Sequence, residues 1–221
     1  YETNAYSSSV TLQSKMNTIS SAYSELSKSK SEYVQFYMKN HEQIPTWIMI
    51  KVVNFSTFID VLHNSKTNVT HAICKLYSMY DDNNLPNVKL LIGSLHWLRR
   101  VRNSCAHNER VYCIHQTQAR NNSASGRILD PYYTQLPTSY SRCTEKNIFD
   151  ILVYFKYFLP TEEFTPMIIE LKNMLIELQN TLQTNAFDNV RGQMGIKNLN
   201  VLDALIALPK SKIEYHKFDT L

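Results

Sequence analysis

Apolar residues recur at helical spacing along most of the chain. The first series, with steps of three, four or seven residues, consists of Leu12, Met16, Ile19, Tyr23, Leu26, Tyr33 and Tyr37. This spacing predicts one long amphipathic helix with an apolar seam like that of a coiled coil. Such a seam usually packs in a core, but it can also contact a partner, and the sequence leaves both interpretations open.

Further helices are predicted where apolar periodicity meets start and stop signals. They cover residues 45–63, 69–80, 85–112, 144–159, 161–184 and 199–208. Pro45 and Pro86 suit helix starts, and Thr144 and Thr161 are expected as N-caps. Together with a content of only 4 glycines, this pattern predicts an all-α fold in the form of a helical bundle.

Length and composition set the broad class of the protein. A chain of 221 residues with 43% hydrophobic content can bury one substantial core, so residues 1–221 are expected to form a single domain. No run of 18 apolar residues is present, so no membrane partner is expected. The polar start Tyr1-Glu2-Thr3-Asn4 lacks a methionine, which predicts that there is no signal peptide and that some N-terminal sequence is missing. The 4 cysteines lack close regular spacing, which favours a reducing cytoplasm.

The predicted helix over residues 85–112 has an unusual polar face. On an ideal helical wheel, an arc of roughly 80° holds His96, Arg99, Asn103, His107 and Arg110. Arg102 instead falls on the arc that should be buried, among Leu91, Leu95, Leu98 and Ala106. An arginine on such an arc needs a partner, either an internal carboxylate or a surface supplied by another subunit.

Positive charge is concentrated around this helix. Between residues 83 and 128, seven basic residues stand against one acid, Glu109, whereas the whole chain carries only +4. This distribution is typical of a polyanion-binding site. The candidate RNA-binding residues are His96, Arg99, Arg100, Arg110, Arg120 and Arg127.

A long loop is predicted over residues 117–142, which contain two prolines and a run rich in Asn and Ser. Arg120 and Arg127 lie in it, and Tyr132 and Tyr133 could stack on RNA bases. A loop that is merely mobile explains the same sequence equally well.

Three neighbouring side chains suit phosphodiester chemistry. The imidazole of His107 can transfer a proton, the guanidinium of Arg102 can bind two oxygens of a phosphate, and the amide of Asn103 can orient either group. A structural interpretation also fits, with Arg102 tying helices together and His107 closing a helix end.

A zinc site is a weaker alternative. The pairs Cys105-x-His107 and Cys113-x-His115 contain suitable ligand types. Residues two apart on a helix point roughly 200° from one another, so neither pair can chelate a metal without local unwinding. The sequence therefore predicts no metal and no cofactor.

The segment from residue 98 to residue 110, with Arg102-Asn103-Ser104-Cys105-Ala106-His107 at its centre, resembles the signature of the Abi-like (AbiD/AbiF) abortive-infection proteins of the HEPN superfamily. Pro45-Thr46-Trp47 and Val53-Asn54-Phe55-Ser56 resemble an upstream landmark of that family, with Ser56 where glycine is usual. Tyr157-Phe158-Leu159-Pro160 and Met194-Gly195-Ile196 resemble later landmarks. The resemblance covers most of residues 30–205.

The resemblance implies a HEPN-like helical bundle, and a homodimer whose two motif helices form one composite active site. By position, Arg102, Asn103 and His107 would be catalytic. It further implies a metal-independent endoribonuclease of phage defence or of a toxin system, which cleaves RNA by 2′-OH attack to a 2′,3′-cyclic phosphate. An antitoxin or a non-coding RNA is a possible partner.

Two other classes of function remain open at this point. A catalytically silent RNA-binding or oligomerisation module would also use the basic helix. A protein-binding regulator would explain the apolar seam that begins at Leu12, but not the concentration of positive charge.

Overall fold

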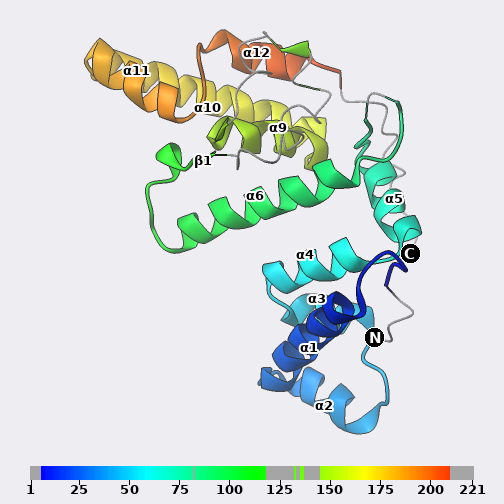
Figure 1. The fold of residues 1–221 in the computed structure, drawn as a ribbon. Coiled ribbons are helices and arrows are strands. Elements are labelled where there is room, and N and C mark those ends of the chain that lie inside the picture. Colours follow the sequence, from blue (N-terminus) through cyan, green and yellow to red (C-terminus); the bar gives the residue numbers. More distant parts are fainter. Residues whose placement is uncertain (1–5, 82, 118–131, 133–134, 137–144, 210–221) are drawn as a thin grey trace. The chain divides into compact units, whose positions relative to one another are not determined.

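The computed structural model describes residues 6–81, 83–117, 132, 135–136 and 145–209 (Figure 1). The chain forms two compact units, Tyr1–Ala72 and Ile73–Leu221. Helices build both units, and the strands β1 (Gln116–Thr117) and β2 (Glu145–Lys146) contain two residues each. The prediction of an all-α fold is confirmed. The expectation of a single domain over residues 1–221 stays a prediction.

The N-terminal unit contains α1 (Leu12–Lys28), α2 (Glu32–Asn40), α3 (Thr46–Val52) and α4 (Phe55–Asn64), and α5 (Thr67–Leu76) leads from it into the second unit. Its buried core consists of Ala22, Leu26, Val34, Ile48 and Met49. Helices α1 and α4 pack against each other.

The single long helix predicted from residue 12 to residue 37 is wrong. The chain is extended at Ser29 and Ser31, which divide it into α1 and α2, and the side chain of Gln35 donates to the Ser29 carbonyl over 2.7 Å. The predicted seam is also not core at its start, because Leu12 is 66% and Met16 53% exposed.

The helix predicted over residues 45–63 is likewise two helices. Asn54 separates α3 from α4, and its side chain accepts from the Thr57 N–H over 3.0 Å as the N-cap of α4. The carboxylate of Glu25 on α1 accepts from the Asn54 N–H and from the Thr57 hydroxyl, which ties α1 to the start of α4. A polar side chain therefore starts a new helix inside an apolar stretch.

The C-terminal unit contains α6 (Val88–Ala106), the 3₁₀ turn η2 (Val111–Cys113), α9 (Ile148–Phe158), α10 (Thr161–Thr181), α11 (Thr184–Gln193) and α12 (Asn200–Ala207). Helix α9 packs against both α6 and α10, and α12 packs against α10. The side chains of Trp97, Phe149, Tyr154, Ile168 and Ile196 are almost fully buried in this unit.

Several predicted helix boundaries are wrong. Asn87, and not Pro86, starts α6, because its side chain accepts from the Leu90 N–H over 3.0 Å. Asn147, and not Thr144, caps α9, and Thr161 is the first residue of α10 and not its N-cap.

The predicted loop over residues 117–142 lies almost entirely outside the described residues, and so do Arg120, Arg127 and Tyr133. Tyr132 is described and is buried, with its ring centroid 4.7 Å from that of Tyr157. Its expected role in stacking on RNA is therefore wrong.

Within the described part of the chain, none of the helices combines the length and the apolar character that a bilayer span requires.

Candidate functional site

Helix α6 ends inside the motif that the sequence predicted to be helical throughout. Its last residue is Ala106, and His107 is the C-cap. Asn108 adopts a left-handed φ of 55°, the Glu109 N–H donates to the Ser104 carbonyl over 2.9 Å, and the Asn108 N–H donates to the Cys105 carbonyl over 3.1 Å. These two hydrogen bonds form a Schellman motif. The helix therefore stops one residue before the end of the motif and leaves His107 exposed at the C-cap.

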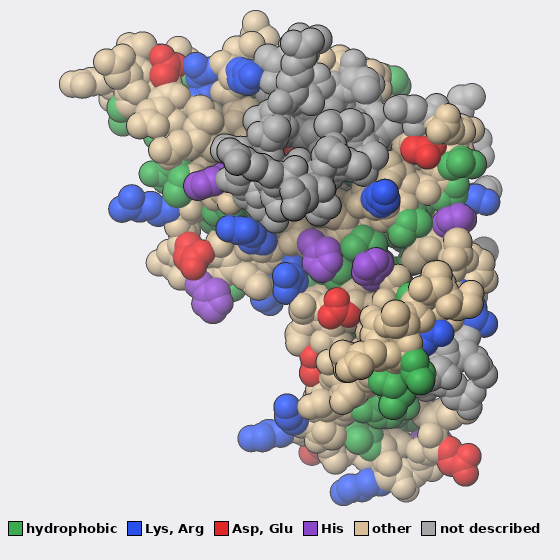
Figure 2. Space-filling view, in the orientation of Figure 1, with side chains coloured by type: hydrophobic (Ala, Val, Ile, Leu, Met, Phe, Trp, Pro, Cys, Tyr) green, Lys and Arg blue, Asp and Glu red, His purple; other side chains and the backbone are tan. Residues whose placement is uncertain are grey.

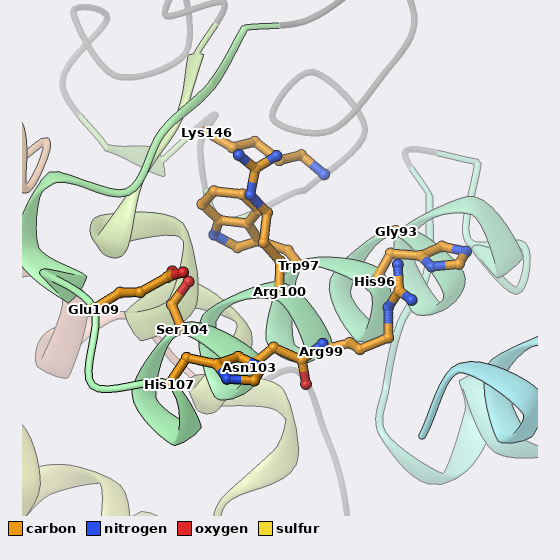
Figure 3. Close-up of a pocket in the computed structure, with 10 residues that line it drawn as sticks. All are labelled: Gly93, His96, Trp97, Arg99, Arg100, Asn103, Ser104, His107, Glu109 and Lys146. Atoms are coloured by element: carbon orange, nitrogen blue, oxygen red, sulfur yellow. The ribbon is translucent and has the colours of Figure 1, made fainter. Parts of the chain in front are cut away.

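A cavity of about 610 Å³ lies beside this end of α6 (Figure 3). It is lined by Gly93, His96, Trp97, Arg99, Arg100, Asn103, Ser104, His107, Glu109 and Lys146. On the face shown in Figure 2, Lys, Arg and His side chains gather along α6. The cavity is therefore open to ligands and bordered by groups that bind anions.

The structure brings together five of the predicted site residues, which are His96, Arg99, Arg100, Asn103 and His107. Arg110 does not line the cavity, because the chain leaves the helix before reaching it. Arg120 and Arg127 lie outside the described residues.

Arg102 is placed differently from its neighbours in the motif. It is exposed and does not line the cavity, and its Nη1 donates to Asn103 Oδ1 over 3.2 Å. The apolar arc on which it was predicted is buried at Leu91 but exposed at Ala106. Because Arg102 is exposed, it does not need an internal carboxylate as a partner. Its hydrogen bond to Asn103 links a residue on the outer surface of α6 to a residue that lines the cavity.

A buried tryptophan fixes the wall of the cavity. The Trp97 side chain is 1% exposed, and its Nε1 donates to the Asn147 carbonyl over 3.0 Å. The Arg100 guanidinium lies 5.6 Å from the centre of the Trp97 ring, within the range of a cation–π interaction. Asn147 in turn caps α9, so α6 and the start of α9 are held together at this wall.

Lys146 is a lining residue that sequence analysis missed. It lies in β2, which pairs antiparallel with β1 so that Lys146 is opposite Gln116. This pairing and the hydrogen bond from Trp97 to the carbonyl of the next residue, Asn147, bring it to α6, and a two-residue strand leaves no periodic pattern. The one sequence signal nearby is Asn147-x-x-Asp150, which follows Lys146 directly and forms a capping box at the start of α9. It indicates that the backbone next to Lys146 has a fixed conformation.

The charges around the cavity favour an anionic ligand. Among the described lining residues, Arg99, Arg100 and Lys146 have basic side chains and His96 and His107 have imidazole rings, whereas Glu109 is the one carboxylate. No group of three or more metal-ligating side chains occurs within the described part of the chain.

The chain is similar in sequence to a known family. The family model described as Abi-like protein matches residues 1–113 of the 221, a segment that includes all of α6 and every lining residue of the cavity except Lys146. No curated protein and no solved structure matches the chain.

Proposed function

Because the chain belongs to the Abi-like protein family, we propose that it is a cytoplasmic abortive-infection effector of the AbiD/AbiF type, with a HEPN-like bundle, that acts in phage defence or as a toxin by cleaving RNA without a metal. The family supports the role in defence. The cavity beside α6 supports the RNA chemistry.

One observation carries the proposal: Asn103 and His107 open into the same cavity as Arg99 and Arg100. Guanidinium groups can hold the phosphates of an RNA backbone through paired hydrogen bonds. A histidine and an amide in the same cavity can transfer a proton and orient the reacting groups at one of these phosphates. A protein that only needed a solvated helix end would not require this combination.

The proposed reaction needs only the RNA and these side chains. The ribose 2′-oxygen attacks the adjacent phosphorus, a new bond from the 2′-oxygen to phosphorus forms, and the bond from phosphorus to the 5′-oxygen breaks. His107 accepts the 2′-OH proton, and an imidazolium returns a proton to the 5′-oxygen. Arg102 stabilises the extra negative charge of the pentavalent intermediate. The products are a 2′,3′-cyclic phosphate and a 5′-OH.

The position of Arg102 supports assembly as a homodimer. Its guanidinium is exposed next to Asn103, on the outer surface of α6 rather than in the cavity. In a two-fold dimer that buries this surface, each Arg102 would reach the phosphate bound by the other copy. Two copies would also supply two His107 side chains, one as base and one as acid. An antitoxin or a non-coding RNA would act by covering the same cavity.

The test is incubation of end-labelled RNA with the wild type, His107→Ala and His115→Ala in excess EDTA. His115 is an exposed histidine outside the cavity, so His115→Ala is a matched control. We expect His107→Ala to lower the cleavage rate by roughly 10²-fold or more while RNA binding survives, because only the proton carrier is lost. His115→Ala should cleave normally and leave cyclic phosphate ends.

Wild-type cleavage that requires added metal, or that persists unchanged in His107→Ala, would overturn the mechanism. Binding of RNA without cleavage by the wild type would instead favour the catalytically silent RNA-binding module.

A further inference from the structure

The Lys146 side chain reaches α6 from a different part of the chain. Its ammonium nitrogen lies 3.8 Å from the position that a Cβ would occupy on Gly93, and 5.8 Å from the centre of the Tyr154 ring on α9. The ammonium group therefore lies within ordinary contact distance of α6 at Gly93. Lys146 is half-buried between α6 and α9, and its Nζ borders the cavity.

The backbone on either side of this lysine is held firmly. The strand pairing fixes Lys146 opposite Gln116. On the other side, the Asn147 N–H donates to Asp150 Oδ2 over 2.7 Å, and the Asn147 side chain accepts from the Phe149 N–H over 3.1 Å. Lys146 is therefore a positioned cation, and not a surface lysine on a mobile segment.

Arg100 is positioned by the same contacts. Its guanidinium lies over Trp97, whose indole N–H donates to the Asn147 carbonyl. Figure 3 shows the side chains of Arg100 and Lys146 extending to the same side of α6, whereas those of Arg99 and Asn103 extend to another side. Arg100, over Trp97, and Lys146, near Gly93, thus form a cationic pair at the end of the cavity away from His107.

This pair is too far from the motif to share its phosphate. The Arg100 guanidinium lies 5.6 Å from the centre of the Trp97 ring. At 1.5 Å of rise per residue, Trp97 precedes His107 by about 15 Å along the axis of α6, and Gly93, which the Lys146 ammonium approaches, precedes it by about 20 Å. A single phosphate group cannot span such a distance. A ligand that contacts both ends of the cavity must carry a second anionic group.

We propose that Arg100 and Lys146 form a second phosphate subsite, which binds a backbone phosphate of single-stranded RNA one or more nucleotides away from the phosphate at Asn103 and His107. The substrate is then an oligonucleotide with at least two phosphates, and a dinucleoside monophosphate is a poor ligand. This inference rests on the proposed RNA-cleaving function. It also extends the site beyond residues 1–113, which the family model matches.

The experiment measures binding of short RNAs to the full chain by fluorescence anisotropy. Each RNA contains the same central dinucleotide, with a 2′-deoxy sugar to prevent cleavage, and is lengthened by one nucleotide at a time on either the 5′ or the 3′ side. The proteins are the wild type, Lys146→Gln, Lys146→Arg and Lys89→Gln. Lys89 is an exposed lysine of α6 outside the cavity, so Lys89→Gln removes the same charge as a control.

For the wild type we expect a step in affinity of roughly three- to tenfold when the added phosphate reaches the subsite, in one direction of extension only. Lys146→Gln should lose the step, Lys146→Arg should restore it, and Lys89→Gln should retain it. The slope of log affinity against log salt should fall by roughly 0.7 in Lys146→Gln, as expected for one phosphate contact on a single strand.

An equal step in Lys146→Gln and in the wild type would overturn the subsite and leave the proposed function intact. Failure of the wild type to bind any of the RNAs would overturn both. Circular dichroism of each variant checks that the helices are intact.

Discussion

Arg100 and Arg102 lie two residues apart on α6 but have different surroundings. Arg100 lies over the buried Trp97 and lines the cavity. Arg102 is exposed, and it donates a hydrogen bond to the side chain of the next residue, Asn103. In the second half of α6, the buried face contains Trp97 and Ser104. The side of the helix that carries Arg100 borders the cavity and is called the cavity edge. The side that carries Arg102 faces outward and is called the outer edge.

The difference shows that burial along a helix can end before the helix does. Leu91 and Leu95 are buried as the helical wheel predicts, but Ala106, on the same arc, is exposed. An arginine near the end of that arc is therefore available to another molecule. In the proposed function, the cavity edge binds RNA and the outer edge contacts a second copy.

Substitution of Gly195 should damage the cavity edge most severely. Gly195 has a φ of 77°, and a Cβ there would lie 2.1 Å from the side chain of Asn147, the residue that anchors Trp97. We expect Gly195→Ala to lower the free energy of unfolding by roughly 2–4 kcal/mol, since it adds backbone strain and displaces a helix cap. RNA affinity should fall with it, because Lys146 adjoins Asn147. Urea denaturation and RNA titration measure the two effects.

Gly192→Ala is the matched control. It lies on α11, and no atom of the described residues comes within 4 Å of a Cβ built there, apart from its chain neighbours and the backbone of the helix itself. The free energy of unfolding should therefore rise by up to about 1 kcal/mol, because alanine favours a helix more than glycine does. Equal effects at the two glycines would show that the contact with Asn147 is unimportant.

Charge reversal should separate the two edges of α6. We expect light scattering at micromolar concentration, without RNA, to give twice the chain mass of 25.7 kDa for the wild type. Arg102→Glu should give the mass of one chain, because a carboxylate replaces the cation at the proposed interface. Arg100→Glu should keep the dimer mass but bind RNA roughly tenfold more weakly. A wild-type mass of one chain would contradict assembly through the outer edge.

Cysteine labelling gives the smallest and most local signal. Cys105 lies exposed at the outer edge, whereas Cys74 is fully buried, and burial raises the pKa of the Cys74 thiol to about 11. At pH 8 a pKa raised to that value leaves only about one Cys74 thiol in a thousand ionised, so it should react with a thiol reagent only after unfolding.

In a variant with serine at Cys113 and Cys143, the labelling rate of Cys105 should fall as protein concentration rises through the dimer range. Cys74 should show no such dependence. If the Cys105 rate is independent of concentration, the outer edge is not the interface.

Residues of the site that share one helix could be predicted from the sequence. His96, Arg99, Asn103 and His107 line one cavity because helical geometry fixes which side chains project on the same side. The wheel could not show that Arg102 is exposed, since that depends on where the packing against α6 ends.

The helix boundaries and the position of Lys146 could not be predicted from helical geometry, for two other reasons. Asn54 and Asn147 start helices because their side chains accept hydrogen bonds from backbone N–H groups. The apolar pattern of the sequence continues on both sides of these residues, so it does not show where one helix ends and the next begins. Lys146 reaches the cavity through a pairing of two-residue strands that are far apart in the chain. Such tertiary contacts leave no local pattern.

The location of bound RNA can be measured by NMR on the isotopically labelled chain, with the side-chain N–H signals of arginine and the ring signals of histidine as probes. An RNA protected by a 2′-deoxy sugar is titrated into the wild type, and Arg191, which is paired with Asp188 on α11, serves as the internal control. We predict that the signals of Arg99, Arg100 and His107 shift together with one dissociation constant while the Arg191 signal stays fixed. Shifts confined to other parts of the chain, with the signals of the α6 cavity unchanged, would show that RNA binds elsewhere and that the proposed site is wrong.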